Sequence, residues 1–169
     1  MKKQYTILMV GLTLLCVGYA NGLTKTEKKI LNYVEKHSGE AINLLEKVVN
    51  INSGSLNIEG NRKVGAIFQR ELDKLGFRTY WVTYPESIKR SGHLFAEMRG
   101  GKGKKIVMVG HLDTVFELDH PFQKFSRNGN TAYGPGVTDM KSGDVSLLYT
   151  MKALHHIDAL KGMDLTLVF

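Results

Sequence analysis

Apolar residues recur at helical spacing in four segments of the chain. The first two segments lie between residues 24 and 49, and the pair Thr24 and Glu27 forms a capping-box pattern at their start. We predict two consecutive helices here. A turn-rich break follows them at residues 50–55.

The third segment gives the clearest helical pattern, because apolar residues between Val64 and Leu75 line one face and charged residues occupy the other. Gly76 follows at the position where a left-handed residue commonly ends a helix. The fourth segment comes after Asp139 and carries an apolar stripe from Leu147 to Leu154. We predict one helix in each of these two segments.

Aromatic and β-branched residues predict strands between the third and fourth helices and again after the fourth. The expected strands are residues 77–84, 93–98, 105–109, 131–133 and 164–169. Residues 105–109 are apolar at four consecutive positions, so we expect a central strand that is covered on both faces. The segment 99–105, rich in glycine and lysine, is predicted to be a hairpin-type turn between its two neighbouring strands.

The order of these elements predicts an α/β fold, a three-layer α/β/α sandwich with a mixed sheet. The sequence DLTLVF stops inside an apolar strand with no loop after it. We therefore expect the domain to be incomplete at its C-terminus.

Residues 1–20 have the features of a secretory signal peptide: a positive start, a short apolar core at residues 7–17, and small residues before a cleavage site after Ala20. The apolar run is shorter than the roughly 20 residues that a membrane-spanning helix needs. We therefore expect an exported protein, periplasmic or extracellular, with no stable membrane anchor after cleavage. Cys16 is the single cysteine, so the mature chain would have neither a disulfide nor a cysteine metal ligand.

The formal net charge of the chain is +7, from 23 Lys and Arg against 16 Asp and Glu. The basic residues are scattered, and no nucleic-acid-binding motif accompanies them. The dense basic segment 99–105 also lacks the GxxxxGK[ST] order of a phosphate-binding loop. We interpret the charge as a solvated surface and expect no nucleic-acid partner.

His111 and Asp113 follow the apolar strand 105–109 through a single glycine. Binding sites in open α/β sheets form where strands end. Imidazole binds zinc well, and a ligand histidine usually donates its other N–H to a carboxylate, which Asp113 is placed to supply. Because H-x-D also arises by chance, a loop histidine beside a capping residue is the competing interpretation.

Asp139 follows a glycine-rich turn at residues 134–136 and precedes the fourth helix. One interpretation is a helix cap, a role that Thr138 would fill equally well. The other is a carboxylate that bridges two divalent cations, as in two-metal hydrolases. The residues alone leave both open. Glu117 and Asp144 are interpreted as ordinary loop and first-turn charges.

Two motifs resemble the M20 family of zinc metallopeptidases, in particular its glutamate carboxypeptidase-like branch. They are GHLDTVF at residues 110–116 and YGPGVTDMKSG at residues 133–143. The resemblance extends to the segment 51–55 and covers most of residues 40–169.

The resemblance implies a zinc exopeptidase-like fold and a site that holds two Zn²⁺ ions. In that site His111 would bind one zinc, Asp139 would bridge both, and Asp113 would act as a catalytic residue that orients His111. In the family the peptide bond after the bridging aspartate is often cis, which here would be Asp139–Met140.

The sequence departs from the family at Ser142, where glycine is common. The family's Glu-Glu pair, a general base and a metal ligand, comes after the strand that corresponds to residues 164–169 and is therefore not in this sequence. The helical lid domain, which often makes dimer contacts, is also not in it. We therefore interpret residues 21–169 as the N-terminal part of the catalytic domain, and expect any homodimer to form through the missing domain.

These features predict a zinc-dependent hydrolase of amide bonds in small peptides or N-acyl amino acids, carboxypeptidase- or dipeptidase-like, whose N-terminal fragment is inactive alone. An N-acyl-amino-acid deacylase is the alternative among hydrolases. Outside them, the alternative is a non-catalytic pseudo-enzyme or secreted binding module that retains the fold. The sequence names no substrate-binding residue.

Overall fold

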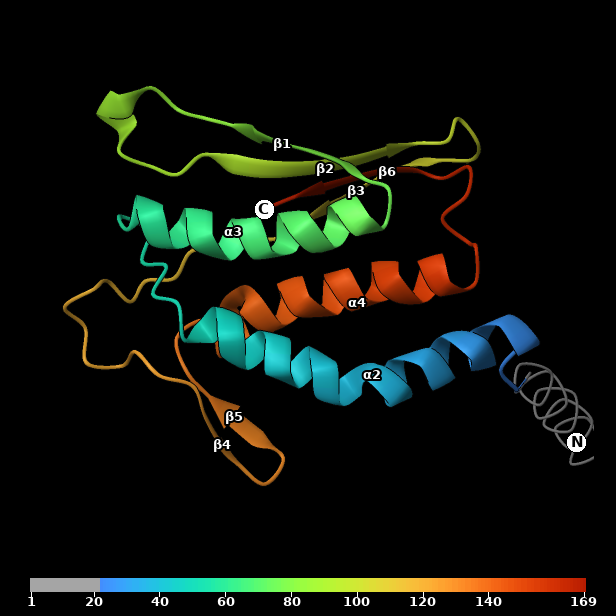
Figure 1. Cartoon of the computed structure of the whole chain (residues 1–169), viewed down its shortest axis with the longest axis horizontal. Coiled ribbons are helices and arrows are strands. Elements are labelled where there is room, and N and C mark those ends of the chain that lie inside the picture. The colour runs from blue at the N-terminus through green and yellow to red at the C-terminus, as the bar shows by residue number, and fades with distance from the viewer. Residues whose placement is uncertain (1–21) are drawn as a thin grey trace, which may run out of the picture.

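The computed structural model describes residues 22–169, which form a four-stranded mixed sheet, three helices and a two-stranded hairpin (Figure 1). The expected signal peptide lies outside the described residues. No helix within residues 22–169 combines the length and the apolar character needed to cross a membrane. The elements are α2 (Lys25–Val49), α3 (Ile58–Lys74), β1 (Arg78–Val82), β2 (His93–Arg99), β3 (Lys105–Val109), β4 (Ser126–Asn128), β5 (Thr131–Tyr133), α4 (Ser142–His156) and β6 (Asp164–Val168).

The first helix, α2, is a single helix of 25 residues, so the prediction of two consecutive helices was wrong. Its start is as predicted: the Thr24 hydroxyl accepts from the Glu27 N–H, and the Glu27 carboxylate accepts from the Thr24 N–H. Gly39 is helical, and the helix continues through it. The C-terminal part of α2 enters the core through Val48 and Val49.

The second helix, α3, ends as predicted, since Gly76 adopts the left-handed conformation with φ of 86°. Its middle lies close to strand β1. The Trp81 ring packs over Gly65, and the Arg62 guanidinium lies 3.8 Å from the centre of that ring. The contact joins the helix to the first strand of the sheet.

The strand order in the sheet is β1-β2-β6-β3. Strand β2 runs antiparallel to both β1 and β6, whereas β3 runs parallel to β6, so the predicted α/β fold with a mixed sheet is confirmed. Because β6 lies between β2 and β3, the segment 99–105 is not a hairpin turn, contrary to the prediction.

Strand β3 was predicted to be central, but among the described residues it forms an edge of the sheet. It pairs with β6 on one side only, which leaves Val107 63% and Val109 70% exposed. The apolar run indicated correctly that β3 is a strand. Its position depends on which strands pair, which a local pattern does not encode.

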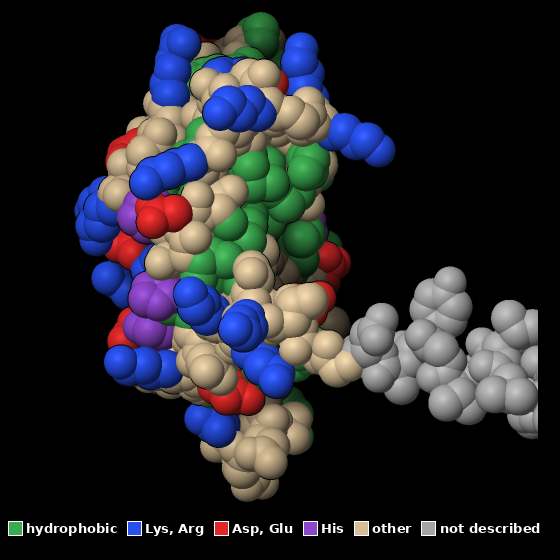
Figure 2. Space-filling model, turned by 90° about the vertical axis from the view of Figure 1, so that its right-hand side faces the viewer, with side chains coloured by type: hydrophobic (Ala, Val, Ile, Leu, Met, Phe, Trp, Pro, Cys, Tyr) green, Lys and Arg blue, Asp and Glu red, His purple; other side chains and the backbone are tan. Residues whose placement is uncertain are grey.

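The three helices lie on one side of the sheet, with α3 next to β1 and β2 and with α2 packed against α4 (Figure 1). Along β2 and β6 the buried residues alternate, with Leu94, Ala96, Leu165 and Leu167 facing the helices. Figure 2 shows hydrophobic side chains gathered in a patch on one side of the molecule, with Lys and Arg side chains spread around it. The carboxyl ends of the parallel strands β3 and β6 meet at one edge, where the residues after Val109 form a loop.

Candidate metal centre

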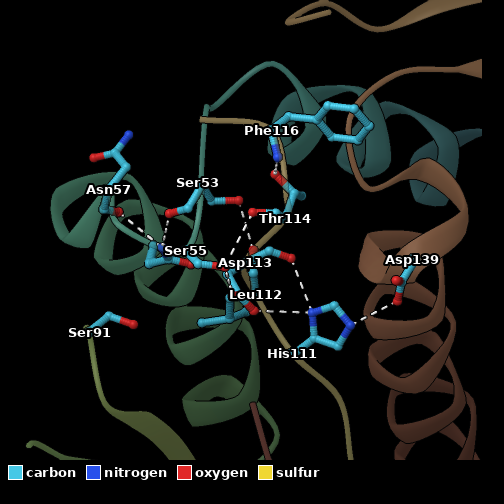
Figure 3. A network of polar contacts seen from close by, with 12 residues as sticks. Ser53, Ser55, Asn57, Ser91, His111, Leu112, Asp113, Thr114, Phe116 and Asp139 are labelled. Carbon is cyan, nitrogen blue, oxygen red and sulfur yellow. Dashed lines mark hydrogen bonds and ion pairs between the residues drawn. The ribbon is translucent and has the colours of Figure 1, made fainter. Parts of the chain in front are cut away.

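The loop after β3 is held by the segment that joins α2 to α3 (Figure 3). The Thr114 N–H donates to the Ser53 carbonyl at 2.8 Å, and the Ser55 N–H donates to the Thr114 carbonyl at 3.0 Å. The buried Ser53 hydroxyl donates to the Leu112 carbonyl at 2.8 Å. These bonds fix the backbone on both sides of Asp113, which explains why the 51–55 segment accompanies the histidine motif.

Asp113 lies against the Nδ1 side of His111. The His111 Nδ1 atom is 3.1 Å from the Asp113 carbonyl oxygen and 3.2 Å from its carboxylate Oδ1. The other carboxylate oxygen, Oδ2, accepts from the Ser55 hydroxyl. Asp113 therefore stands where a carboxylate that orients His111 would have to be, and Ser55 holds it there.

Asp139 lies on the opposite side of the same ring. Its Oδ1 atom is 2.9 Å from His111 Nε2, although the two residues are 28 positions apart (Figure 3). Asp139 belongs to the irregular turn η3 (Val137–Lys141), with φ of −128° and ψ of 99°, and the Asp139–Met140 peptide bond is cis, as the resemblance implied.

The interpretation of Asp139 as a helix cap does not hold. Helix α4 begins at Ser142, its N-cap residue is Lys141, and no side chain caps it. Gly136, with φ of 78°, opens the turn in the left-handed conformation that glycine tolerates, which lets the chain bend and direct Asp139 toward His111. The turn thus delivers the carboxylate to the site.

The imidazole of His111 faces a carboxylate at each nitrogen. Partial burial lowers its pKa, but the hydrogen bonds and charges of Asp139 and Asp113 outweigh this, so the pKa is raised above its ordinary value. The surroundings of the ring thus favour positive charge. A cation bound at Nε2 would benefit from the same two carboxylates.

His111 and Asp139 fit a zinc ion as two of its ligands, since an imidazole nitrogen and a carboxylate oxygen converge on one point. Zinc sites in proteins use three or four protein ligands. Within residues 22–169 no group of three or more His, Cys, Asp or Glu side chains is placed to hold a metal ion. The described residues could therefore supply only part of a metal centre.

Two buried charged residues beside the site were missed by the sequence analysis. Lys141 and Asp144 are both fully buried. The Lys141 ammonium donates to the carbonyls of Val48 and Ile51, at 2.9 and 3.0 Å, and so ties η3 to the end of α2. Burial lowers the pKa of Lys141 to about 8.

Asp144 lies in the first turn of α4, as interpreted, but it is buried there and is therefore not an ordinary first-turn charge. Burial raises its pKa to about 7, although the charges of His111 and Lys141 act in the opposite direction. Gly110 makes room for this carboxylate, because a Cβ atom at position 110 would lie 2.1 Å from Asp144 Oδ1. Gly110, directly after β3, was the one indication in the sequence that another group packs closely against the end of that strand.

A model of peptidase family M20/M25/M40 matches residues 107–169. Carboxypeptidase G2 of Pseudomonas sp. (strain RS-16) is 35% identical over 115 residues, which are 67% of this chain and 27% of that protein. The chain therefore spans about a quarter of the length of this relative. Residues 107–169, which the family model matches, contain both the His111 motif and the Asp139 motif.

Solved structures share the fold at lower identity. Human carnosine dipeptidase 1 aligns with a TM-score of 0.69 and 19% identity, over 83% of this chain and 33% of that one. An M20 family metallo-carboxypeptidase from Sulfolobus solfataricus aligns with a TM-score of 0.61 and 20% identity, over 76% and 30%. A glutaminyl cyclase of Macrostomum lignano also aligns, with a TM-score of 0.60 and 13% identity, over 90% and 43%.

The glutaminyl cyclase shows that this fold by itself does not fix the reaction. The motifs, the family model and the 35% identical relative do not rest on the fold. On this evidence, the chain belongs to peptidase family M20/M25/M40.

Proposed function

We propose that the protein containing this chain is a zinc-dependent hydrolase of amide bonds in small peptides or N-acyl amino acids. The observation that carries the proposal is the convergence of His111 Nε2 and Asp139 Oδ1 at the end of β3, inside the segment that the family model matches. Family membership supports a metal-dependent hydrolase. Zinc is our choice of metal because imidazole and carboxylate ligands suit it.

The chain's own residues would prepare the histidine. The Asp113 carbonyl and carboxylate accept the Nδ1 proton. When a metal ion displaces the Nε2 proton that Asp139 accepts here, the Nε2 lone pair would be free to bind it. Ser55, by donating to Asp113, keeps that carboxylate from rotating away. We assign Asp113 the role of orienting His111 and Asp139 the role of bridging two Zn²⁺ ions.

Bound zinc would polarise the scissile carbonyl and lower the pKa of water at the site. Hydrolysis also needs a general base, and the two described carboxylates that line the cavity are already engaged: Asp113 by His111 and Ser55, and Asp139 by His111. We therefore expect the 169-residue chain alone to hydrolyse no peptide. Zinc-dependent turnover by the purified chain would contradict this expectation.

Metal titration tests the ligand assignment without any need for activity. Zinc added to the chain should shift the NMR resonances of the His111 ring and of the backbone around Asp139. The His111→Ala variant should lose the shift at Asp139. The matched control is His155→Ala, because His155 is exposed at the end of α4, far along the helix from the site.

Hydrolysis is tested in the complete protein. A panel of dipeptides and N-acyl amino acids should be hydrolysed, a chelator should stop the reaction, and zinc should restore it. Hydrolysis of acyl amino acids without hydrolysis of dipeptides would favour the deacylase alternative. Zinc binding with no hydrolysis of any member would support the non-catalytic alternative and refute our proposal.

A further inference from the structure

A cavity of about 440 Å³ opens beside His111 and Asp139. Its charged residues, His111, Asp113 and Asp139, belong to the candidate metal centre, and within residues 22–169 no Lys or Arg lines it. The remaining walls are mainly apolar or aromatic. They include Val115, Phe116, Phe122, Ala132, Tyr133 and Val137.

The aromatic wall is held in place by the same loop that positions His111. The Phe116 N–H donates to the hydroxyl of buried Thr114 at 3.3 Å, and the Phe116 carbonyl accepts from the Asn52 side chain at 3.0 Å. The Phe122 ring packs edge-on against the Phe116 ring, with centroids 5.2 Å apart. The rings therefore form a fixed surface.

Much of this surface is open to a ligand, since Phe122 is 40% and Tyr133 53% exposed. A cavity of about 150 Å³ is large enough to take benzene in a protein interior. The present cavity therefore has room for a ring together with the atoms that would link it to an amide near His111. A carboxylate there would meet two carboxylates, Asp113 and Asp139, against the single imidazole of His111, which those two already engage.

We propose that this cavity, walled by Phe116, Phe122 and Tyr133, binds a bulky apolar group of the substrate, aromatic or branched aliphatic, next to the scissile amide. This inference rests on the proposed function, because it is the metal centre at the cavity's edge that makes the bound group part of a substrate. Its substrate class is peptides or acyl amino acids with an apolar group at that position. Acidic groups are disfavoured in it, because its described wall holds two carboxylates and only one imidazole.

The test uses the metal-free chain and two neutral probes, N-acetylphenylalanine amide and N-acetylalanine amide, titrated by NMR. The phenylalanine probe should bind about tenfold tighter, because the extra ring buries apolar surface. It should also shift the backbone resonances of Phe116 and Tyr133. An N-acetylglutamate probe should bind more weakly than the alanine probe.

The Tyr133→Ala variant should reduce the tenfold preference for the phenylalanine probe over the alanine probe to about threefold or less. Because the Tyr133 side chain is half exposed, its removal leaves the core of the fold intact. The matched control is Tyr84→Ala, because Tyr84 is 44% exposed and lines a neighbouring cavity, which shares Ser55, His111 and Asp113 with this one but none of its aromatic wall. Equal binding of the two neutral probes, or a preference lost in Tyr84→Ala and kept in Tyr133→Ala, overturns the proposal. Neither result bears on the zinc titration, so failure of the cavity and failure of the metal centre are distinguishable.

Discussion

Replacement of Gly39 by alanine tests whether α2 is one helix. Gly39 lies in the middle of α2, its backbone is helical, and no atom lies within 4 Å of the position that a Cβ atom would take. Alanine therefore meets no clash there. In the interior of an exposed helix, alanine is favoured over glycine by about 1 kcal/mol, because glycine loses more backbone entropy on folding.

Gly39→Ala should raise the free energy of unfolding by about 1 kcal/mol and the melting temperature by about 2–4 °C. The contrasting variant is Gly65→Ala, at a glycine that is also helical but buried in α3. A Cβ atom there would lie 2.4 Å from Trp81 Cζ2 and 3.0 Å from Leu112 Cδ1. Overpacking of this kind costs about 1–3 kcal/mol, which cancels or exceeds the gain in helix propensity.

Urea unfolding followed by circular dichroism measures both variants against the parent chain. We expect Gly39→Ala to be the more stable of the two by about 1–3 kcal/mol. If Gly39→Ala instead lowers the midpoint, position 39 is not helical, and the two-helix interpretation of the sequence regains its place. If the two variants behave alike, the close contact between Gly65 and Trp81 does not exist in solution.

Three further predictions concern single side chains. Asp113→Asn should weaken zinc binding by about 10–100-fold in the NMR titration, since the oriented carboxylate beside Nδ1 is lost, and an unchanged affinity would remove Asp113 from the site. Lys141→Met should destabilise the chain by about 2–3 kcal/mol in urea at pH 7, because two buried carbonyls lose their charged donor; a neutral effect would show that they find water instead. Burial raises the pKa of Tyr149 to about 12, so the folded state keeps the phenol neutral above pH 10, where the unfolded state ionises. The parent chain should therefore lose about 1.3 kcal/mol more stability than Tyr149→Phe between pH 9 and pH 11, and equal losses would refute the assigned burial.

Local sequence patterns predicted most elements because their signals are local. The apolar stripe and terminal glycine of α3, the capping box of α2 and the short strand β5 each depend on neighbouring residues. The predictions that failed concern pairing between residues that lie far apart in the sequence. The insertion of β6 between β2 and β3, and with it the edge position of β3, is decided by pairing across more than 50 residues.

The prediction of the site succeeded and failed for the same reasons. The sequence indicated His111 and Asp139 through strand ends and a glycine-rich turn, but the residues alone left Asp139 equally explained as a cap. The structure rules out the interpretation of Asp139 as a cap, because α4 begins three residues later, at Ser142. The burial of Asp144 was not predictable from its own neighbourhood, since a charge in the first turn of a helix is ordinarily exposed.

The place of β6 has a consequence for the order in which the chain folds as the ribosome makes it. Among the described strands β6 is synthesised last, yet β2 and β3 have no pairing with each other and are joined only through it. The β1–β2 pair and α3, which packs on both of these strands, have their partners early, whereas α2 waits for α4 and β3 waits about 55 residues for β6. Until β6 emerges, β3 has no strand partner, and the His111 loop can be held only by its hydrogen bonds to the segment 51–55. The residues that define the metal centre would therefore be among the last to reach their final positions.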